Sequence, residues 1–127
     1  NLKICMMVEI PSNIILLEKF LALGIDGISI GSNDLTQLTL GIDRDSAKLA
    51  ETFDERNEAV MISLERAVKV AKSMGVTSSI CGQAPSVYPE ITEKLVSWGV
   101  TSVSVSPDMI DVTREIIAKA EAKLGIV

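Results

Sequence analysis

The sequence contains no histidine. This absence excludes a Ser-His-Asp triad, a Cys-His pair, an imidazole-ligated zinc ion and a phosphorylated histidine within this chain. Any acid–base or metal chemistry must therefore use carboxylates, thiols, hydroxyls, lysine or arginine.

Basic residues and long apolar runs are scarce as well. Lysine and arginine number 12 against 17 aspartate and glutamate residues, and the formal net charge is −5. Because nucleic acids and anionic membranes require a positively charged surface, we expect neither as a partner. No apolar run approaches the ~20 residues of a membrane span, and the first residues do not resemble a signal peptide. We therefore expect a soluble, cytoplasmic protein.

Only two cysteines are present, Cys5 and Cys81. Both occur in apolar segments that have the pattern of β-strands. A chain of 127 residues, of which 47% are hydrophobic, can form a core without a disulfide. We expect two free thiols and assign Cys5 to packing.

A glycine that follows a helical pattern recurs at four places in the chain, Gly24, Gly75, Gly99 and Gly125. Glycine commonly takes the left-handed position just after a helix, so each is predicted to end one. Strand-like segments follow the first three. We predict strands at residues 2–8, 26–30, 77–81 and 102–105, and helices that begin at Pro11 and span residues 55–74, 86–98 and 107–124.

Alternation of strands with helices predicts an α/β fold with a parallel sheet and right-handed crossovers. The four βα units occupy 127 residues, about half of the ~250 residues of a (β/α)8, or TIM, barrel. We therefore expect residues 1–127 to form one domain that is half of such a barrel. The strand pattern directs Ile28, Ile30, Val103 and Val105 toward the helices, and Glu9, Ser29, Ser79, Cys81 and Ser104 toward the opposite face.

The connection formed by residues 31–54 is much longer than the usual two to about six residues between a strand and a helix. We expect a long loop there, and barrels place their functional residues in such loops. Arg44 within it can hold an anion. Alternatively, it can pair with the neighbouring Asp43 or Asp45 on the surface.

Two carboxylates follow adjacent predicted strands. Glu9 ends the first strand, and Asp34 lies four residues beyond the second. Because parallel strands end at the same edge of a sheet, these carboxylates can converge, and oxygen ligands alone suit Mg²⁺. The alternative is that Glu9 caps the next helix and Asp34 forms a local turn.

Cys81 ends the third predicted strand, where barrels place catalytic side chains. A thiol at this position can donate a proton or act as a nucleophile. A buried structural cysteine is the alternative.

Four motifs in order resemble the C-terminal barrel of the phosphoenolpyruvate-utilising enzymes. This family comprises phosphoenolpyruvate synthase, pyruvate phosphate dikinase and Enzyme I of the sugar phosphotransferase system. The motifs are VEIPS at residues 8–12, IGSNDLTQ at 30–37, DR at 43–44 and ICGQ at 80–83. Within the family, CGQAPS at residues 81–86 and FDER at 53–56 are most similar to the synthase branch, because the other members usually have CGE.

The resemblance implies a role for each carboxylate and for the thiol. It implies that Glu9 and Asp34 hold Mg²⁺ together with pyruvate or phosphoenolpyruvate, and that Cys81 protonates the enolate carbon. A Mg²⁺ ion between the two carboxylates and the pyruvate oxygens would serve as a Lewis acid for the enolate.

The resemblance also implies a phosphate-binding group. It assigns Asn33 and Arg44 to the phosphate of the substrate, and it places Gly31 and Ser32 of the same motif among the substrate-binding residues. Donors of this kind stabilise a phosphoryl group in transit.

Other family features are missing from this sequence, namely the phosphohistidine domain, the ATP-binding domain and further arginines. We therefore expect a C-terminal piece of a longer, oligomeric enzyme that makes phosphoenolpyruvate from pyruvate with ATP and Mg²⁺, its partners being those two domains. Two alternatives remain. One is a Mg²⁺-dependent pyruvate aldolase or lyase, in which a cysteine like Cys81 is not expected, and the other is a non-catalytic dimerisation piece.

Overall fold

The computed structural model describes residues 1–126, so that Val127, the last residue of the predicted domain, lies outside it. Its centre is a sheet of four parallel strands in sequence order, which confirms the α/β class. The register aligns Val8 with Ile30, Ile30 with Ile80, and Ile80 with Val103. The carboxyl ends of the strands therefore lie side by side. The strands are β1 (Cys5–Val8), β2 (Gly27–Gly31), β3 (Thr77–Cys81) and β4 (Ser102–Val103).

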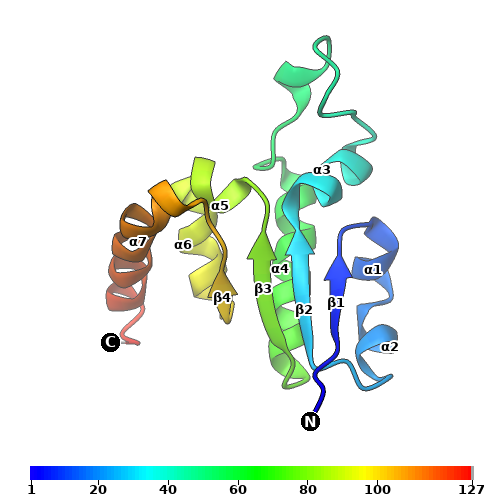
Figure 1. The fold of residues 1–127 in the computed structure, drawn as a ribbon, viewed down its shortest axis with the longest axis vertical. Helices are drawn as coiled ribbons and strands as arrows, with labels where there is room; N and C mark the ends of the chain where they lie inside the picture. Colours follow the sequence, from blue (N-terminus) through cyan, green and yellow to red (C-terminus); the bar gives the residue numbers. More distant parts are fainter. Residues whose placement is uncertain (127) are drawn as a thin grey trace.

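Helices cover one face of this sheet and leave the other face bare (Figure 1). Figure 1 shows α4 behind β2 and β3, α1 and α2 beside β1, and α6 and α7 at the opposite end. The α-helices are α1 (Pro11–Ile15), α2 (Leu17–Leu21), α3 (Ser32–Leu40), α4 (Glu58–Ser73), α5 (Ala84–Val87), α6 (Pro89–Trp98) and α7 (Ile110–Lys123), and two 3-10 turns, η1 (Ala50–Thr52) and η2 (Pro107–Met109), complete the chain.

The core lies between the sheet and its helices. Ile30 and Ile80 are fully buried against Leu64 and other apolar residues of α4. Ser29 and Ser79, one residue earlier in each strand, are only half-buried on the bare face. This alternation confirms the predicted orientation of the two central strands.

All four predicted helices are shorter or broken, and the helix expected at residues 107–124 begins with the 3-10 turn η2, so that α7 starts at Ile110. The helix that begins at Pro11 is interrupted at Leu16, and the helix expected at residues 86–98 is divided by Pro89, which begins α6. The long helix begins at Glu58 rather than residue 55 because the Asn57 side chain accepts a hydrogen bond from Ala59 N and caps it.

The connection at residues 31–54 is not a loop throughout, contrary to expectation. Its first part is α3, which buries Leu35 and Thr36 and ends at Gly41 in a left-handed conformation. The Thr36 hydroxyl donates a hydrogen bond to Ser32 O at 2.7 Å and supports the first turn.

The two cysteines are free thiols, as predicted, but Cys5 is not packed in the core. It is exposed on the bare face of β1, where Cys5 and Met7 alternate with the more buried Met6 and Val8. Among residues 1–126, none of the helices combines the length and apolar character needed to cross a membrane.

Candidate functional site

The carboxyl edge of the sheet brings together residues that are far apart in the sequence. Glu9 follows β1, Gly31 ends β2 and Cys81 ends β3, and Gly31 is aligned directly with Cys81 in the parallel register. The candidate site therefore lies at this edge.

Glu9 lies over the end of β2. A Cβ atom built on Gly31 would be 3.3 Å from Glu9 Oε2, so the missing side chain of Gly31 leaves room for this carboxylate. The Glu9 carboxylate does not cap α1. Instead, the Asn13 side chain accepts hydrogen bonds from the amides of Glu9 and Ile10, each at 3.3 Å.

The N-terminus of α3 begins directly after β2. Gly31 occupies the N-cap position and provides no side-chain hydrogen bond, and the first turn carries Ser32, Asn33 and Asp34. The first amide groups of a helix have no partner within the helix, and the helix dipole favours an anion there. This end of α3 is suited to a carboxylate or phosphate.

The turn after β3 packs against the start of α3. Asn33 Oδ1 accepts a hydrogen bond from Gln83 N at 3.1 Å. This contact fixes the Asn33 side chain at the junction of the two turns, next to Gly82.

A hollow of about 370 Å³ opens beside this junction and is lined by Asn33, Arg44, Asp45, Phe53 and Gln83. The predicted phosphate ligands Asn33 and Arg44 therefore share one cavity. The ion pairs formed within residues 1–126 do not include Arg44, so its guanidinium does not pair with Asp43 or Asp45. An unpaired guanidinium in a cavity can bind an anion.

The Cys81 thiol is half-buried on the bare face of the sheet. It donates a hydrogen bond to Ile30 O at 3.4 Å, and Sγ lies 3.6 Å from Ser29 Oγ. Ser29 is therefore a polar side chain in contact with the thiol. The sequence placed both on one face but did not indicate this contact.

The two carboxylates fit Mg²⁺ by the chemistry of their donors. Glu9 lies over Gly31 and Asp34 is exposed in the first turn of α3, and both offer the hard oxygen ligands that Mg²⁺ prefers. No cluster of three or more potential metal ligands occurs in the part of the chain that the structure describes. Two carboxylates leave the other ligand positions of Mg²⁺ to water molecules and to oxygen atoms of the substrate, which is the usual way in which this ion is bound.

Sequence reasoning missed Gln83, Phe53 and Asp45 in the lining of the hollow, and it also missed Glu55. Gln83 directly follows the predicted Cys81-Gly82 turn, so its position could have been anticipated. Glu55 is only 3% exposed, although it stands between charged residues in the sequence. Burial raises the pKa of Glu55, and the nearby Ser32 hydroxyl opposes this effect in part.

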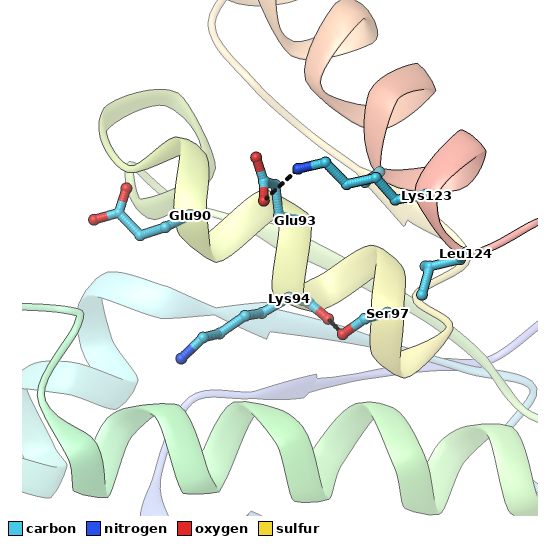
Figure 2. A pocket seen from close by; sticks show the side chains of 7 residues that line it. Glu90, Glu93, Lys94, Ser97, Lys123 and Leu124 are labelled. Carbon is cyan, nitrogen blue, oxygen red and sulfur yellow. Dashed lines mark hydrogen bonds and ion pairs between the residues drawn. The ribbon is translucent and has the colours of Figure 1, made fainter.

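A second hollow lies away from these residues, between α6 and α7 (Figure 2). It has a volume of about 320 Å³. An ion pair between Lys123 Nζ and Glu93 Oε2 at 3.8 Å joins the two helices, while Figure 2 shows the charged groups of Glu90 and Lys94 pointing away from it. None of the predicted site residues lines this hollow.

Comparison with known proteins identifies the domain. A family model described as "PEP-utilising enzyme, PEP-binding domain" matches residues 1–122. The chain is 52% identical over 124 residues to phosphoenolpyruvate synthase of Helicobacter pylori, 53% identical over 126 residues to a probable phosphoenolpyruvate synthase of Staphylothermus marinus, and 52% identical over 125 residues to phosphoenolpyruvate synthase of Synechocystis sp.. Each alignment covers 98% of this chain but only 15% of the relative. The chain therefore belongs to the phosphoenolpyruvate-utilising enzyme family and corresponds to its PEP-binding domain.

Proposed function

We propose that this chain is part of a phosphoenolpyruvate synthase, an enzyme that converts pyruvate to phosphoenolpyruvate with ATP and Mg²⁺. The observation that carries the proposal is the shared cavity of Asn33 and Arg44 at the same sheet edge as Cys81. The names of the relatives favour this activity over an aldolase.

The α3 N-terminus, Asn33 and Arg44 bind the anionic groups of the substrate in this proposal. Gly31 and Ser32 are buried and shape the start of α3, while Arg44 contributes a charged donor suited to phosphate. Because these groups come from α3 and the connection that follows it, the two anionic groups of phosphoenolpyruvate can be held at separate points.

Glu9 and Asp34 would hold Mg²⁺. When bound, the ion supplies Lewis-acid stabilisation of the negative charge that develops on the substrate oxygen. The two carboxylates also orient the substrate, because Glu9 lies over Gly31 at the start of the α3 anion site.

The Cys81 thiolate takes a proton from the methyl carbon of pyruvate and leaves the enolate, and in the reverse direction the thiol returns this proton to the enolate carbon. Its Sγ lies at the end of β3 on the bare face, where a substrate held by α3 can reach it. The 3.6 Å contact with Ser29 Oγ restricts the orientation of the thiol.

The rest of the enzyme completes the barrel and supplies the phosphorylated histidine and the ATP site. Within residues 1–126, β1 pairs only with β2 and β4 only with β3, so each has an unpaired edge. Further strands from the longer chain would cover these edges and the bare face, which makes this domain the second half of a (β/α)8 barrel.

A titration of the chain with phosphoenolpyruvate and Mg²⁺, followed by NMR, tests the proposal. We expect the resonances of Asn33, Arg44 and Cys81 to shift, and Arg44→Ala to weaken binding. If no chemical shift changes at about 20 mM ligand, the proposed function is wrong. It is also wrong if the changes occur at the hollow between α6 and α7 instead.

A further inference from the structure

Glu55 is the only buried charged side chain among residues 1–126. Its Oε1 atom has no hydrogen-bond partner within them. Buried polar groups are normally paired, so an unpaired carboxylate oxygen calls for an explanation in terms of function.

The Glu55 carboxyl is close enough to two parts of the candidate site to interact with both. One is Ser32 at the start of α3, which is fully buried and whose hydroxyl also lacks a hydrogen-bond partner within residues 1–126. The other is the segment that carries Arg44, whose positive charge acts on the carboxyl, as does the negative charge of Asp54. Glu55 is the group that links the α3 N-terminus to the segment carrying Arg44.

The residue after Glu55 holds this segment from the outside. The Arg56 guanidinium binds both oxygens of Asp54 at 3.0 Å, contacts Glu90 Oε1 at 3.4 Å, and stacks over the Tyr88 ring at 4.5 Å. Arg56 is thus held on the α5–α6 side, while its neighbour Glu55 is buried within the connection between α3 and α4.

Arg44 has no ion-pair partner within residues 1–126, although it lines the hollow with Asn33. Arg44 is exposed to solvent, which weakens the attraction between its guanidinium and the buried Glu55 carboxylate, but this attraction still favours positions of Arg44 close to that carboxylate. The charge of Glu55 is therefore suited to bias the position of Arg44.

We propose that Glu55 is a positioning residue, which holds the Arg44-bearing segment against Ser32 and so gives the site its preference for a phosphate-bearing anion over a simple carboxylate. The proposal rests on the proposed function, in which Arg44 binds the substrate phosphate. Glu55 itself does not touch the substrate.

The test compares the affinities of the chain for phosphoenolpyruvate and for pyruvate, both with Mg²⁺, in the wild type and in Glu55→Gln and Glu55→Ala. The ratio of the two affinities is the measured quantity, because a loss of packing alone lowers stability without changing which anion is preferred. We expect the ratio to fall by about tenfold in both variants, the scale of one charge-assisted contact. Glu51→Gln, an exposed glutamate in the same connection, is the matched control and should keep the wild-type ratio.

Glu55→Gln retains the volume of the side chain, so it keeps the test valid if Glu55→Ala does not fold. Arg44→Ala, measured in parallel, separates the two proposals. If Arg44→Ala lowers the ratio and Glu55→Gln does not, Glu55 is a packing residue and this inference is wrong. If the wild type binds phosphoenolpyruvate no more tightly than pyruvate, the proposed function is wrong and the inference fails with it. The same holds if Arg44→Ala keeps the wild-type ratio of the two affinities.

Discussion

Gly82 and Ser32 lie in direct contact at the carboxyl edge of the sheet. A Cβ atom built on Gly82 would be 2.4 Å from Ser32 Oγ, and Gly82 has a φ of +101°, which is unfavourable for any residue with a side chain. This close approach lets Gln83 N reach Asn33 Oδ1. The absence of one side chain thus brings the turn after β3 onto the start of α3.

Gly82→Ala should destabilise the protein more than the same change at Gly24. Gly24 has nearly the same φ, +97°, but a Cβ there meets nothing within 4 Å. Gly24→Ala therefore measures backbone strain alone, about 1–2 kcal/mol. Gly82→Ala should cost a further ~1–3 kcal/mol from steric overlap. Urea unfolding measures both, and equal costs would show that the contact with Ser32 is not tight.

Much of the sheet could be predicted from the sequence because its signals are local. Alternation in residues 28–30 and 79–81 separates a buried face from an open one, and a glycine at Gly75 or Gly99 ends a helix through its own left-handed conformation. The motifs that contain Glu9 and Cys81 also lie at the carboxyl ends of β1 and β3, where the sequence predicts them. These features depend on residues that are neighbours in the sequence, so the sequence alone predicts them.

The remaining features depend on contacts between distant segments. The helix α3 is stabilised by burial of Leu35 and Thr36 against the rest of the fold, and short polar runs such as residues 32–34 do not predict it. Nothing in the sequence indicates that Cys5 is exposed, because an open sheet face can be recognised only when the whole sheet is known. The burial of Glu55 likewise is not evident from its charged neighbours Asp54 and Arg56 in the sequence.

Asp34→Asn should weaken the binding of a divalent metal ion. We expect Mn²⁺, a paramagnetic substitute for Mg²⁺, to bind with about millimolar affinity, because two carboxylates leave most ligand positions to water. Broadening of NMR signals from residues near Glu9 and Gly31 reports this binding. Asp111→Asn, in the first turn of α7, is the control. Unchanged broadening in Asp34→Asn would remove Asp34 from the metal site.

Glu55→Gln should become more stable relative to the wild type as the pH rises. Burial holds the pKa of Glu55 in the folded state above its ordinary value of 4.5. At a pH between 4.5 and this raised pKa, the folded state therefore binds more protons than the unfolded state. The stability of the wild type therefore decreases as the pH rises from 4.5 through the raised pKa. Glutamine does not titrate, and the difference in Tm between the variant and the wild type should grow over this interval.

Thermal unfolding followed by circular dichroism between about pH 4 and about pH 8 measures this difference. Glu51→Gln, the same substitution at an exposed position of the same connection, is the control. If the difference in Tm between Glu55→Gln and the wild type does not change with pH, the Glu55 carboxyl of the wild type is solvated in the folded state.

The chain by itself should form dimers. The unpaired edges of β1 and β4 and the apolar residues exposed near β1, such as Ile4 and Met7, favour association with a second copy. Met7→Lys places a charge on the bare face and should shift the equilibrium toward monomer in light scattering at roughly 50 µM. Ile62→Lys, on the exposed side of α4, is the control. Equal behaviour of the two variants would exclude the bare face as the interface.

Cys81→Ser in the longer enzyme that contains this chain should stop proton transfer at carbon. Serine keeps the size and hydrogen bonding of the side chain, but a hydroxyl releases its proton far less readily than a thiol. Because a general acid or base contributes about 10²–10⁴-fold, interconversion of pyruvate and phosphoenolpyruvate should fall by that factor. Cys5→Ser, at the other end of the bare face, should retain normal turnover.

Exchange of solvent deuterium into the methyl group of pyruvate isolates the step assigned to Cys81. In the proposed function, metal binding and the transfer of phosphate from ATP to a histidine elsewhere in the enzyme do not involve this carbon, so both should continue in Cys81→Ser. A structural role for the thiol leads to the opposite pattern, in which the folded protein is less stable but exchanges normally. Exchange at the wild-type rate in Cys81→Ser would therefore assign the proton transfer to another group.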